Sequence, residues 1–479
     1  MKIYWYSGNL VVVDSFEELE KFLTMSKKSL EWNSSRMRRE TKRYSQPVFE
    51  VLYEGPDNRT IMTFQGFKND VLRLACKHNK PVEFYDCRRI MPEPRMSLAH
   101  GFRNDQESLF NGLLDKGESG ILKAPTRYGK TVMMVNTMRT FPRVRTVLAA
   151  PGVDLLGQLV EELKSWMPER EIKGIFTGSR NRVPSEDITV CSFDSLSKVN
   201  PENVHLLLID EPHAAVSESR APLLAGFKNA RIYGYGATLK GRYDGADKLI
   251  TGLIGPIHSE RTFSEAVEEG AICPIKVSFV KVPFEPFICR DRATAYKRLV
   301  YKNDQVFSLV REIAKNKIPQ DWQTLVFIDQ KKQADTMSQT VEDCEVAIAS
   351  RLKVKERKEL FEKMANNEIK RCVATSIYAQ GVTFPDLRVM INAAGGSGSI
   401  SSVQKPGRLA QVREGKAMGH LVDFMFEPVF DHTSWQQNTS GENMMWSFVV
   451  NDCKARLKVY KSLGYEVEIL ESINDLNLE

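Results

Sequence analysis

The sequence predicts an α/β protein in which two tandem, doubly wound parallel-sheet domains follow a small α+β domain. Strand-like apolar runs alternate with helical patterns from about residue 100 onward, and a second series of the same kind begins after about residue 270. Such alternation is typical of parallel sheets with helices on both faces. We therefore expect three domains, which span residues 1–95, 96–268 and 269–479.

The elements of the small N-terminal domain are predicted from local patterns, with strands where apolar residues gather and helices where they recur at the helical period. The expected strands are Lys2–Tyr6, Leu10–Val13, Val48–Tyr53 and Thr60–Phe64, and the expected helices are Phe16–Met25 and Asn69–His78.

The strands of the two larger domains are predicted from short apolar runs that are separated by helical patterns. In the first series these runs are Ile121–Leu122, Thr146–Ala149, Val190–Phe193, Leu206–Ile209 and Ile232–Tyr235. In the second they are Leu325–Ile328, Val346–Ala349, Arg371–Ala374, Val389–Ala393 and His420–Phe424, and a helical tail is expected over residues 443–462.

The composition is that of an ordinary globular protein, with 42% apolar and 27% charged residues. The 67 basic and 61 acidic residues give a net charge of +6, which allows a polyanionic partner without requiring one. We expect no membrane span and no signal peptide, because neither pattern is found. The eight cysteines are scattered without a Cys-x-x-Cys pair, which predicts a reducing cytoplasm (that of the host, for a phage-encoded chain) and neither disulfides nor a zinc site.

A phosphate-binding loop is predicted between the expected strand at Ile121–Leu122 and the helical pattern after Thr131. The stretch from Ala124 to Thr131 fits the Walker A pattern, with Ala in place of the first Gly. Gly129 lets the backbone approach phosphate oxygens, Lys130 can reach the β and γ phosphates, and Thr131 can place its hydroxyl on Mg²⁺. The alternative is a chance match, which the strand-loop-helix context disfavours. We expect ATP and Mg²⁺ as cofactors.

Two adjacent carboxylates follow the apolar run Leu206–Ile209, at the strand end where ligands collect in open α/β sheets. Asp210 fits a Walker B role, in which it holds Mg²⁺. Glu211 could orient or deprotonate the attacking water. This pair lies 80 residues after Lys130 and is followed by His213.

The segment Asp210–His213 resembles the Asp-Glu-x-His motif of superfamily 2 helicases and translocases, and further segments resemble other motifs of that family in the expected order. The resemblance covers roughly residues 100–425 and implies two RecA-like domains. The first-domain segments are Phe102–Gln106 (adenine reading), Ala150–Pro151 with Leu155–Gln158 (motif Ia), Phe176–Gly178 (Ib), Val190–Phe193 and Gly236–Thr238 (III). The second-domain segments are Leu325–Phe327 (motif IV), Thr375–Ser376 with Gln380–Pro385 (V) and Gln404–Arg408 (VI).

The resemblance also implies roles for single residues. Catalytic roles are implied for Lys130, Asp210, Glu211, His213, Gln404 and Arg408, and metal contacts for Thr131 and Asp210. Nucleotide contacts are implied for Arg103, Gln106, Pro125, Thr126, Gly129, Lys130, Thr131, Gly381 and Arg408. Nucleic-acid contacts are implied for Pro151, Gln158, Thr177, Gly178, Ser192, Phe193, Phe327 and Thr375.

Two positions depart from the family pattern. The family has a second arginine three residues after the Gly-Arg pair of motif VI, and here this position is Gln411, with Arg413 two residues further on. Loss of one such arginine could give a slow or strongly DNA-dependent ATPase. The usual acidic residue of motif V is Thr383, which puts a ribose contact there in doubt.

A basic cluster in the N-terminal domain is a candidate DNA-contacting surface, with a solvated loop as the alternative. It comprises Arg36, Arg38, Arg39, Lys42 and Arg43, flanked by Trp32 and Tyr44. A small N-terminal domain before a compact motor with a short helical tail is similar to the layout of phage UvsW-like branch-migration helicases.

The predicted function is that of an ATP-dependent DNA helicase or translocase, acting as a monomer on branched or forked duplex in phage-type replication, recombination or repair. An RNA helicase and an ATP-gated DNA-binding assembly factor without unwinding remain the alternatives. A helicase-nuclease subunit is not expected, since no nuclease-type carboxylate-lysine cluster is found outside the motor.

Overall fold

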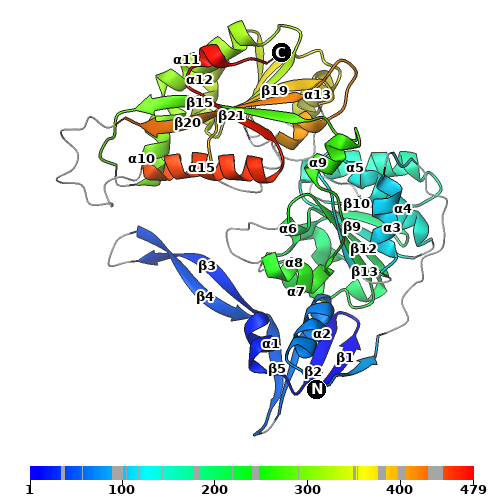
Figure 1. The fold of residues 1–479 in the computed structure, drawn as a ribbon. Helices are drawn as coiled ribbons and strands as arrows, with labels where there is room; N and C mark the ends of the chain where they lie inside the picture. The colour runs from blue at the N-terminus through cyan, green and yellow to red at the C-terminus, as the bar shows by residue number, and fades with distance from the viewer. Residues whose placement is uncertain are drawn as a thin grey trace. The chain divides into compact units, whose positions relative to one another are not determined.

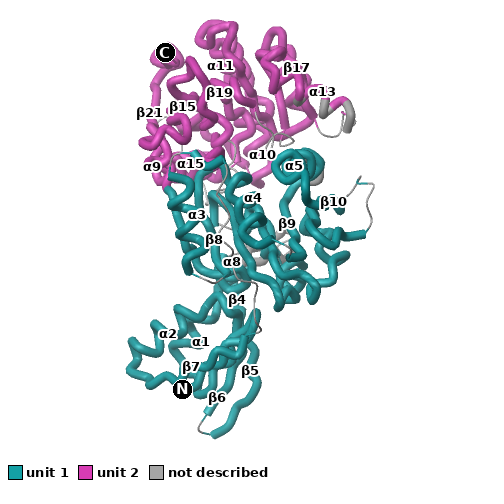
Figure 2. Tube along the Cα trace, turned by 90° about the vertical axis from the view of Figure 1, so that its right-hand side faces the viewer, with its two compact units in different colours: residues 1–125, 129–261 teal, residues 126–128, 262–479 magenta. Residues whose placement is uncertain are grey.

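The computed structural model divides the chain into two compact units (Figure 2). Unit 1 comprises residues 1–125 and 129–261, and unit 2 comprises residues 126–128 and 262–479. The division into three domains stays a prediction. The structure describes residues 1–33, 38–56, 58–88, 101–103, 105–116, 119–142, 144–176, 179, 183–217, 219–239, 247–289, 291–348, 352, 354–375, 384–396, 406–429 and 446–478.

Unit 1 begins with a five-stranded mixed sheet in the order β5-β6-β2-β1-β7. The predicted strands and helices are present, although the first helix ends at Phe22 because the chain becomes extended from Thr24. The strands are β1 (Lys2–Tyr6), β2 (Asn9–Val13), β5 (Phe49–Glu54), β6 (Arg59–Phe64) and β7 (Glu83–Asp86), and the helices are α1 (Glu17–Phe22), η1 (Gln65–Phe67) and α2 (Lys68–Lys77).

Arg38, Arg39, Lys42 and Arg43 of the basic cluster lie on a separate two-stranded antiparallel ribbon, which was not predicted. Strand β3 (Thr24–Asn33) pairs with β4 (Arg38–Pro47) in an unbroken register from Thr24↔Pro47 to Asn33↔Arg38. Figure 1 shows the ribbon as paired blue arrows outside the five-stranded sheet.

The second sheet of unit 1 is seven-stranded and parallel, in the order β10-β11-β9-β12-β13-β8-β14. Its central strands are apolar and buried along their whole length, as expected for a sheet covered on both faces. The strands are β8 (Gly120–Lys123), β9 (Thr146–Ala150), β10 (Ile172–Ile175), β11 (Ile188–Ser192), β12 (Leu206–Asp210), β13 (Arg231–Gly236) and β14 (Ile257–Glu260). The helices are α3 (Gln106–Leu114), α4 (Lys130–Thr140), α5 (Val153–Trp166), η2 (Phe193–Lys198), η3 (Pro201–Asn203), α6 (Pro212–Ala215), α7 (Ala221–Ala225) and α8 (Asp247–Ile254).

The two sheets of unit 1 share one hydrophobic core, with α8 packed between them. The backbones approach closely at two glycines. A Cβ on Gly66 would lie 1.8 Å from the carbonyl oxygen of Thr251, and a Cβ on Gly252 would lie 2.8 Å from the ring of Phe67. A side chain at either position would therefore push the N-terminal sheet away from α8.

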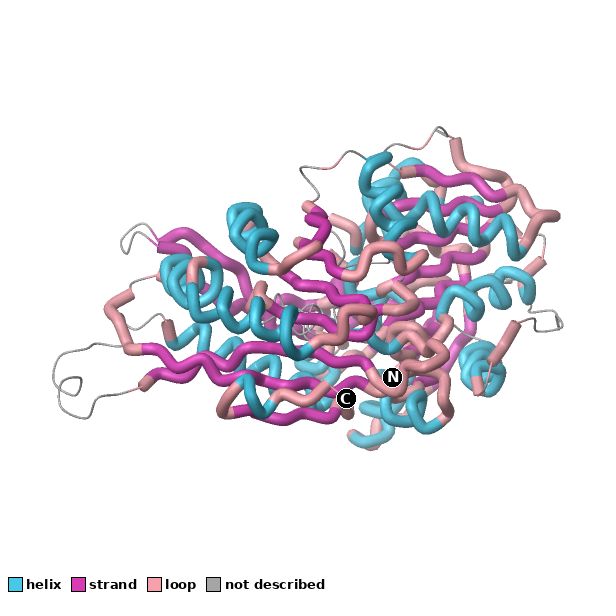
Figure 3. The backbone as a smooth tube through the Cα atoms, turned by 90° about the horizontal axis from the view of Figure 1, so that it is seen from above, coloured by secondary structure: helices cyan, strands magenta, loops and turns pink. Residues whose placement is uncertain are grey.

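Unit 2 contains the second predicted parallel sheet, seven-stranded in the order β17-β18-β16-β19-β20-β15-β21. Figure 3 shows the strands of the chain in magenta, lying side by side with helices in cyan along them. The strands are β15 (Ile275–Phe284), β16 (Gln323–Phe327), β17 (Cys344–Ala347), β18 (Arg371–Ala374), β19 (Leu387–Asn392), β20 (Gly419–Pro428) and β21 (Glu466–Leu470). The helices are α9 (Phe263–Glu268), α10 (Arg292–Tyr296), η4 (Lys297–Tyr301), α11 (Asp304–Glu312), η5 (Ile313–Lys317), α12 (Lys331–Thr340), α13 (Val354–Ala365), η7 (Pro406–Ala410), α15 (Ser447–Ser462) and η9 (Ile473–Asp475).

The C-terminal segment is more than the predicted helical tail. Helix α15 is followed by β21, which pairs with β15 and completes the sheet. A buried ion pair fixes the helix, because Arg456 donates through Nε and Nη2 to the two carboxylate oxygens of Asp423 on β20, both at 2.8 Å. Arg456 also donates to the carbonyl oxygen of Gly396, and Asn392 donates to Asp423 at 3.1 Å. The network joins α15, β20 and the turn after β19.

No described helix combines the length and the apolar composition that a membrane span requires.

Candidate active site

The predicted phosphate-binding loop lies between β8 and α4, at the carboxyl end of a buried strand. Gly129 is the N-cap of α4 and has a φ of +93°, a left-handed conformation that favours glycine. Lys130 opens the helix, and its Nζ donates to the carbonyl oxygen of Pro125 at 3.3 Å. The eleven-residue helix α4 therefore starts directly at the loop. A helix N-terminus that follows a glycine-containing loop is an arrangement that binds phosphate.

The two adjacent carboxylates lie at the end of β12, at the same edge of the sheet as the loop after β8. Burial and the charge of Glu211 raise the pKa of Asp210 to about 7, and the charge of Lys130 opposes the rise. Glu211 has a φ of +54°, which is uncommon for a residue with a side chain. The Nδ1 atom of His213 lies 3.4 Å from Oε2 of Glu211, and this histidine is buried.

These residues fit an ATP·Mg²⁺ complex. Both carboxylates are partly buried, and removing two neighbouring charges from water is costly unless a cation compensates them. Lys130 supplies one positive charge within interaction range of Asp210. The hard oxygen ligands of Asp210 and Thr131 suit Mg²⁺, which is usually held by a carboxylate or two together with substrate phosphates.

The adenine-reading segment lies against the loop. Gln106 begins α3 and is buried, and its Oε1 accepts a hydrogen bond from the backbone N–H of Arg103 at 2.8 Å. A Cβ on Gly129 would lie 2.5 Å from Nε2 of Gln106. A larger residue at position 129 would therefore displace Gln106 as well as strain the loop. Arg103 is exposed, and Thr126 is partly buried.

The end of β13, where motif III was predicted, supports both loops. The backbone N–H of Ala124 donates to the carbonyl oxygen of Gly236 at 3.1 Å. Pro212 packs on two glycines of β13, since a Cβ on Gly234 or Gly236 would lie 2.9 or 2.8 Å from its ring. This close approach explains the glycines in the strand.

In unit 2, the described part of motif VI, from Pro406 to Arg408, lies in the short helix η7, in which Arg408 is buried. Burial and the positive charge of Arg127, a residue grouped with unit 2, lower the pKa of Arg408 to about 9. Lys416 is also buried, and its Nζ donates to the carbonyl oxygens of Leu409 at 2.7 Å and Gln411 at 3.2 Å. Lys416 therefore holds the end of η7.

The departure at Gln411 is followed by an arginine that has its own partner. Nε of Arg413 donates to Oδ1 of Asp386 at 3.1 Å, and 56% of the Arg413 side chain is exposed.

The residues predicted to contact nucleic acid differ in exposure. Pro151 is partly buried and Gln158 is exposed. Ser192, Phe193, Phe327 and Thr375 are buried, so any contribution of theirs acts through the loops that they hold. For Arg38 and Arg39 only the backbone on β4 is described. Five predicted site residues lie outside the described residues: Arg36, Thr177, Gly178, Gly381 and Gln404.

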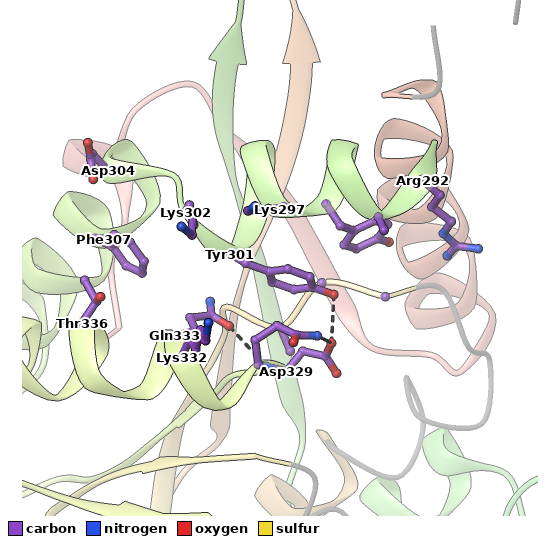
Figure 4. Close-up of a pocket in the computed structure, with 16 residues that line it drawn as sticks. Arg292, Lys297, Tyr301, Lys302, Asp304, Phe307, Asp329, Lys332, Gln333 and Thr336 are labelled. Carbon is purple, nitrogen blue, oxygen red and sulfur yellow. Dashed lines mark hydrogen bonds between the residues drawn. The ribbon is translucent and has the colours of Figure 1, made fainter. Parts of the chain in front are cut away.

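A cavity of about 1220 Å³ lies in unit 2 beyond the carboxyl ends of β16 and β19 (Figure 4). The chain leaves these neighbouring strands in opposite directions, to β17 and to β20, and such a switch point is where open α/β sheets bind ligands. The Tyr301 hydroxyl donates to Oδ2 of Asp329 at 2.9 Å. Basic residues line the cavity: Arg292, Lys297, Lys302 and Lys332.

Sequence reasoning missed this cavity and Lys416. The walls of the cavity come from segments about 100 residues apart in the chain, from α10 to the turn after β19, so no local pattern could reveal it. Nothing in the sequence distinguishes the buried Lys416 from the many exposed lysines.

In the comparison with known proteins, two separate segments of the chain match two protein families. Residues 99–241 match the family described as "Type III restriction enzyme, res subunit", and residues 304–413 match "Helicase conserved C-terminal domain". "Putative helicase 22" of Sulfolobus islandicus filamentous virus (isolate Iceland/Hveragerdi) is 22% identical over 468 residues, covering 88% of this chain and 79% of the relative. "DNA 3'-5' translocase XPB2" of Sulfurisphaera tokodaii is 23% identical over 360 residues, covering 66% of this chain and 80% of the relative.

Solved structures share the fold. The DNA-bound "ATP-dependent Type ISP restriction-modification enzyme LlaBIII" aligns with a TM-score of 0.56 and 14% identity over 80% of this chain and 32% of that enzyme. The chain thus spans about a third of that enzyme. T4 UvsW aligns with 13% identity over 100% of this chain and 99% of UvsW, with a TM-score of 0.36, so the narrower UvsW-like layout stays a prediction. The two matched families and the two parallel sheets confirm the superfamily: the chain belongs to helicase superfamily 2.

Proposed function

We propose that this protein is an ATP-dependent DNA helicase or translocase that remodels branched duplex DNA by branch migration or fork regression. The observation that carries the ATPase part is that the phosphate-binding loop before α4 and the carboxylates of Asp210 and Glu211 lie at the same edge of the first parallel sheet. The preference for DNA is supported by the similarity to a relative named as a DNA translocase. We also propose that the protein acts as a monomer in the cytoplasm.

The phosphate-binding loop and the adenine-reading segment would bind and position the nucleotide. Gln106 and Arg103 bind the base, and the backbone from Pro125 to Thr131 surrounds the phosphates. Bound ATP supplies the phosphoanhydride bond and bound Mg²⁺ neutralises charge on its oxygens. Thr131 and Asp210 hold the metal ion.

Glu211 orients the reacting water and accepts its proton. His213, 3.4 Å from the Glu211 carboxylate, positions that side chain. Arg408 stabilises the negative charge that develops on the phosphates, and Gln404 is proposed to act with it.

Nucleic-acid contacts are proposed on both units. Those of unit 1 involve the segments around Pro151, Thr177 and Ser192. In unit 2, a single nucleic-acid strand would bind in the basic cavity at the carboxyl ends of β16 and β19. Lys297 and Lys302 would contact its phosphates, and Tyr301 would lie beside a base.

The experiment is a comparison of ATPase rates with single-stranded, duplex, forked and four-way DNA and with matched RNA. We expect DNA to stimulate the parent protein, branched forms the most, and Lys130→Ala to fall below about a tenth of the parent rate, at least ~1.4 kcal/mol of barrier. Equal or greater stimulation by RNA would replace the proposal with an RNA helicase. ATP-dependent DNA binding without unwinding would leave an assembly factor.

A further inference from the structure

The ribbon β3–β4 is a long element with a short anchor. Each strand has ten residues, so the ribbon extends about 30 Å. Its base is fixed in unit 1, because Val48 donates its backbone N–H to the carbonyl oxygen of Leu23 at 2.8 Å and the Thr24 hydroxyl donates to that of Glu20 at 2.8 Å. Met25 and Val48 belong to the core of unit 1. Among the described strands, none pairs with either outer edge of the ribbon.

The ribbon is strongly basic beyond its base. Strands β3 and β4 together carry six basic and two acidic residues, a surplus of four. One of the six, Lys27, is buried where the ribbon meets the sheet. Further along, Lys42, Arg43 and Tyr44 are exposed. An isolated two-stranded ribbon is only marginally stable in water, so a partner that pairs with its charge would stabilise it.

We propose that this ribbon enters the major groove of duplex DNA. The groove is about 12 Å wide and admits a two-stranded β-ribbon, whereas the minor groove is about half as wide. Two strands about 4.8 Å apart with side chains on both sides match that width. The duplex carries about one negative charge per 1.7 Å, which complements the basic surplus. A-form RNA has a deep and narrow major groove that side chains cannot enter, so the ribbon favours DNA.

The ribbon is carried by the same compact unit as the phosphate-binding loop. The Gly66 and Gly252 contacts leave no room for a side chain between the N-terminal sheet and α8. The proposal rests on the proposed function in its choice of DNA, and it assigns the duplex contact to one element.

The first test is the salt dependence of binding to a blunt DNA duplex without nucleotide. The variant Arg39→Gln/Lys42→Gln/Arg43→Gln keeps the strand lengths and removes three charges. We expect its slope of log affinity against log salt to be flatter than that of the parent by up to about 2.7, because each lost phosphate contact removes about 0.9. The matched control is Lys454→Gln/Lys458→Gln/Lys461→Gln on α15, which should keep the parent slope. Equal slopes for parent and ribbon variant would overturn the proposal.

The second test asks which groove is used. Duplexes with bulky C5 substituents on the pyrimidines fill the major groove, and a minor-groove ligand such as netropsin fills the other. We expect C5 substitution to weaken parent binding at least tenfold and to have little effect on the ribbon variant, while netropsin has little effect on either. Parent binding that ignores C5 substitution, or that netropsin abolishes, would overturn the major-groove assignment even if the salt slope changes.

ATPase measurements separate this proposal from the proposed function. A parent that hydrolyses no ATP with any DNA would contradict the proposed function, whatever the ribbon binds. A parent that is active, paired with a ribbon variant that binds duplex equally well, would contradict the ribbon assignment alone.

Discussion

At the scale of single residues, the candidate site depends on charged groups that lie close to one another and are partly or fully buried. Asp210, Glu211 and Lys130 share one sheet edge in unit 1. In unit 2, Lys416 is buried beneath the end of η7 and donates to the carbonyl oxygens of Leu409, in η7, and of Gln411, which follows it. Each group can be tested by a substitution that keeps its shape.

Glu211→Gln should bind ATP and turn it over at less than about a tenth of the parent rate, because the amide keeps the shape but cannot accept a proton. Steady-state ATPase and equilibrium ATP binding measure the two properties separately. Glu202→Gln changes an exposed glutamate of the same unit and should behave as the parent does. Normal turnover in Glu211→Gln would remove this residue from the mechanism.

Lys416 should make stability depend on pH. Burial lowers its pKa from the ordinary 10.5 to about 8, with the charge of Cys273 opposing the shift. Between these two values the unfolded chain holds a proton that the folded chain has lost. The free energy of unfolding therefore rises with pH through this window, by at most about 1.4 kcal/mol per pH unit.

The measurement is urea unfolding of the parent and of Lys416→Met from pH 7.5 to 10. We expect the parent to gain stability relative to Lys416→Met as the pH rises. Lys454→Met, at an exposed position on α15, should show no such trend. Parallel profiles for the parent and Lys416→Met would show that the lysine does not titrate in this range.

At the scale of secondary-structure elements, helix α15 is held to the sheet of unit 2 by the Arg456–Asp423 pair. The Arg456 side chain is 3% exposed and that of Asp423 is fully buried. Burial alone would lower the pKa of Arg456, but the charge of Asp423 outweighs it and raises that pKa well above its ordinary value. A pair this deep is costly to break by removing one partner only.

Arg456→Leu and Asp423→Leu should each lower the free energy of unfolding by about 3–5 kcal/mol, since each leaves a buried charge alone. The double variant should lose much less than the sum of the two. A thermodynamic cycle measured by urea unfolding gives the coupling, and the exposed pair Lys315–Glu342 provides a control cycle of about 1 kcal/mol or less. Additive losses at Arg456 and Asp423 would contradict the buried pair.

Most strands that the sequence predicted in the two large sheets share one property: they are short apolar runs that are buried along most of their length, as β9 and β12 are. The ribbon was missed because β3 and β4 are mostly polar and pair only with each other. Strand β21 was missed because its place at the edge depends on β15, about 190 residues earlier. The loop residues Gly129 and Lys130 could be predicted, since their chemistry requires particular side chains at fixed spacing.

At the scale of the whole molecule, the chain combines two parallel-sheet units with an N-terminal sheet that shares the core of the first. The sequence indicated a separate N-terminal domain, but the Gly66 and Gly252 contacts depend on α8, which no sequence pattern links to β6. The proposed activity needs both units, because Lys130 belongs to unit 1 and Arg408 to unit 2. It follows that only the intact chain is expected to remodel DNA.

The most direct test is ATP-dependent branch migration of a mobile four-way DNA junction, compared between the parent and Lys130→Ala. We expect the parent with ATP and Mg²⁺ to convert the junction into duplex products, and Lys130→Ala to bind the junction with similar affinity and leave it intact. A parent that hydrolyses ATP on the junction but never moves it, or a Lys130→Ala variant that moves it as fast as the parent, would contradict the account.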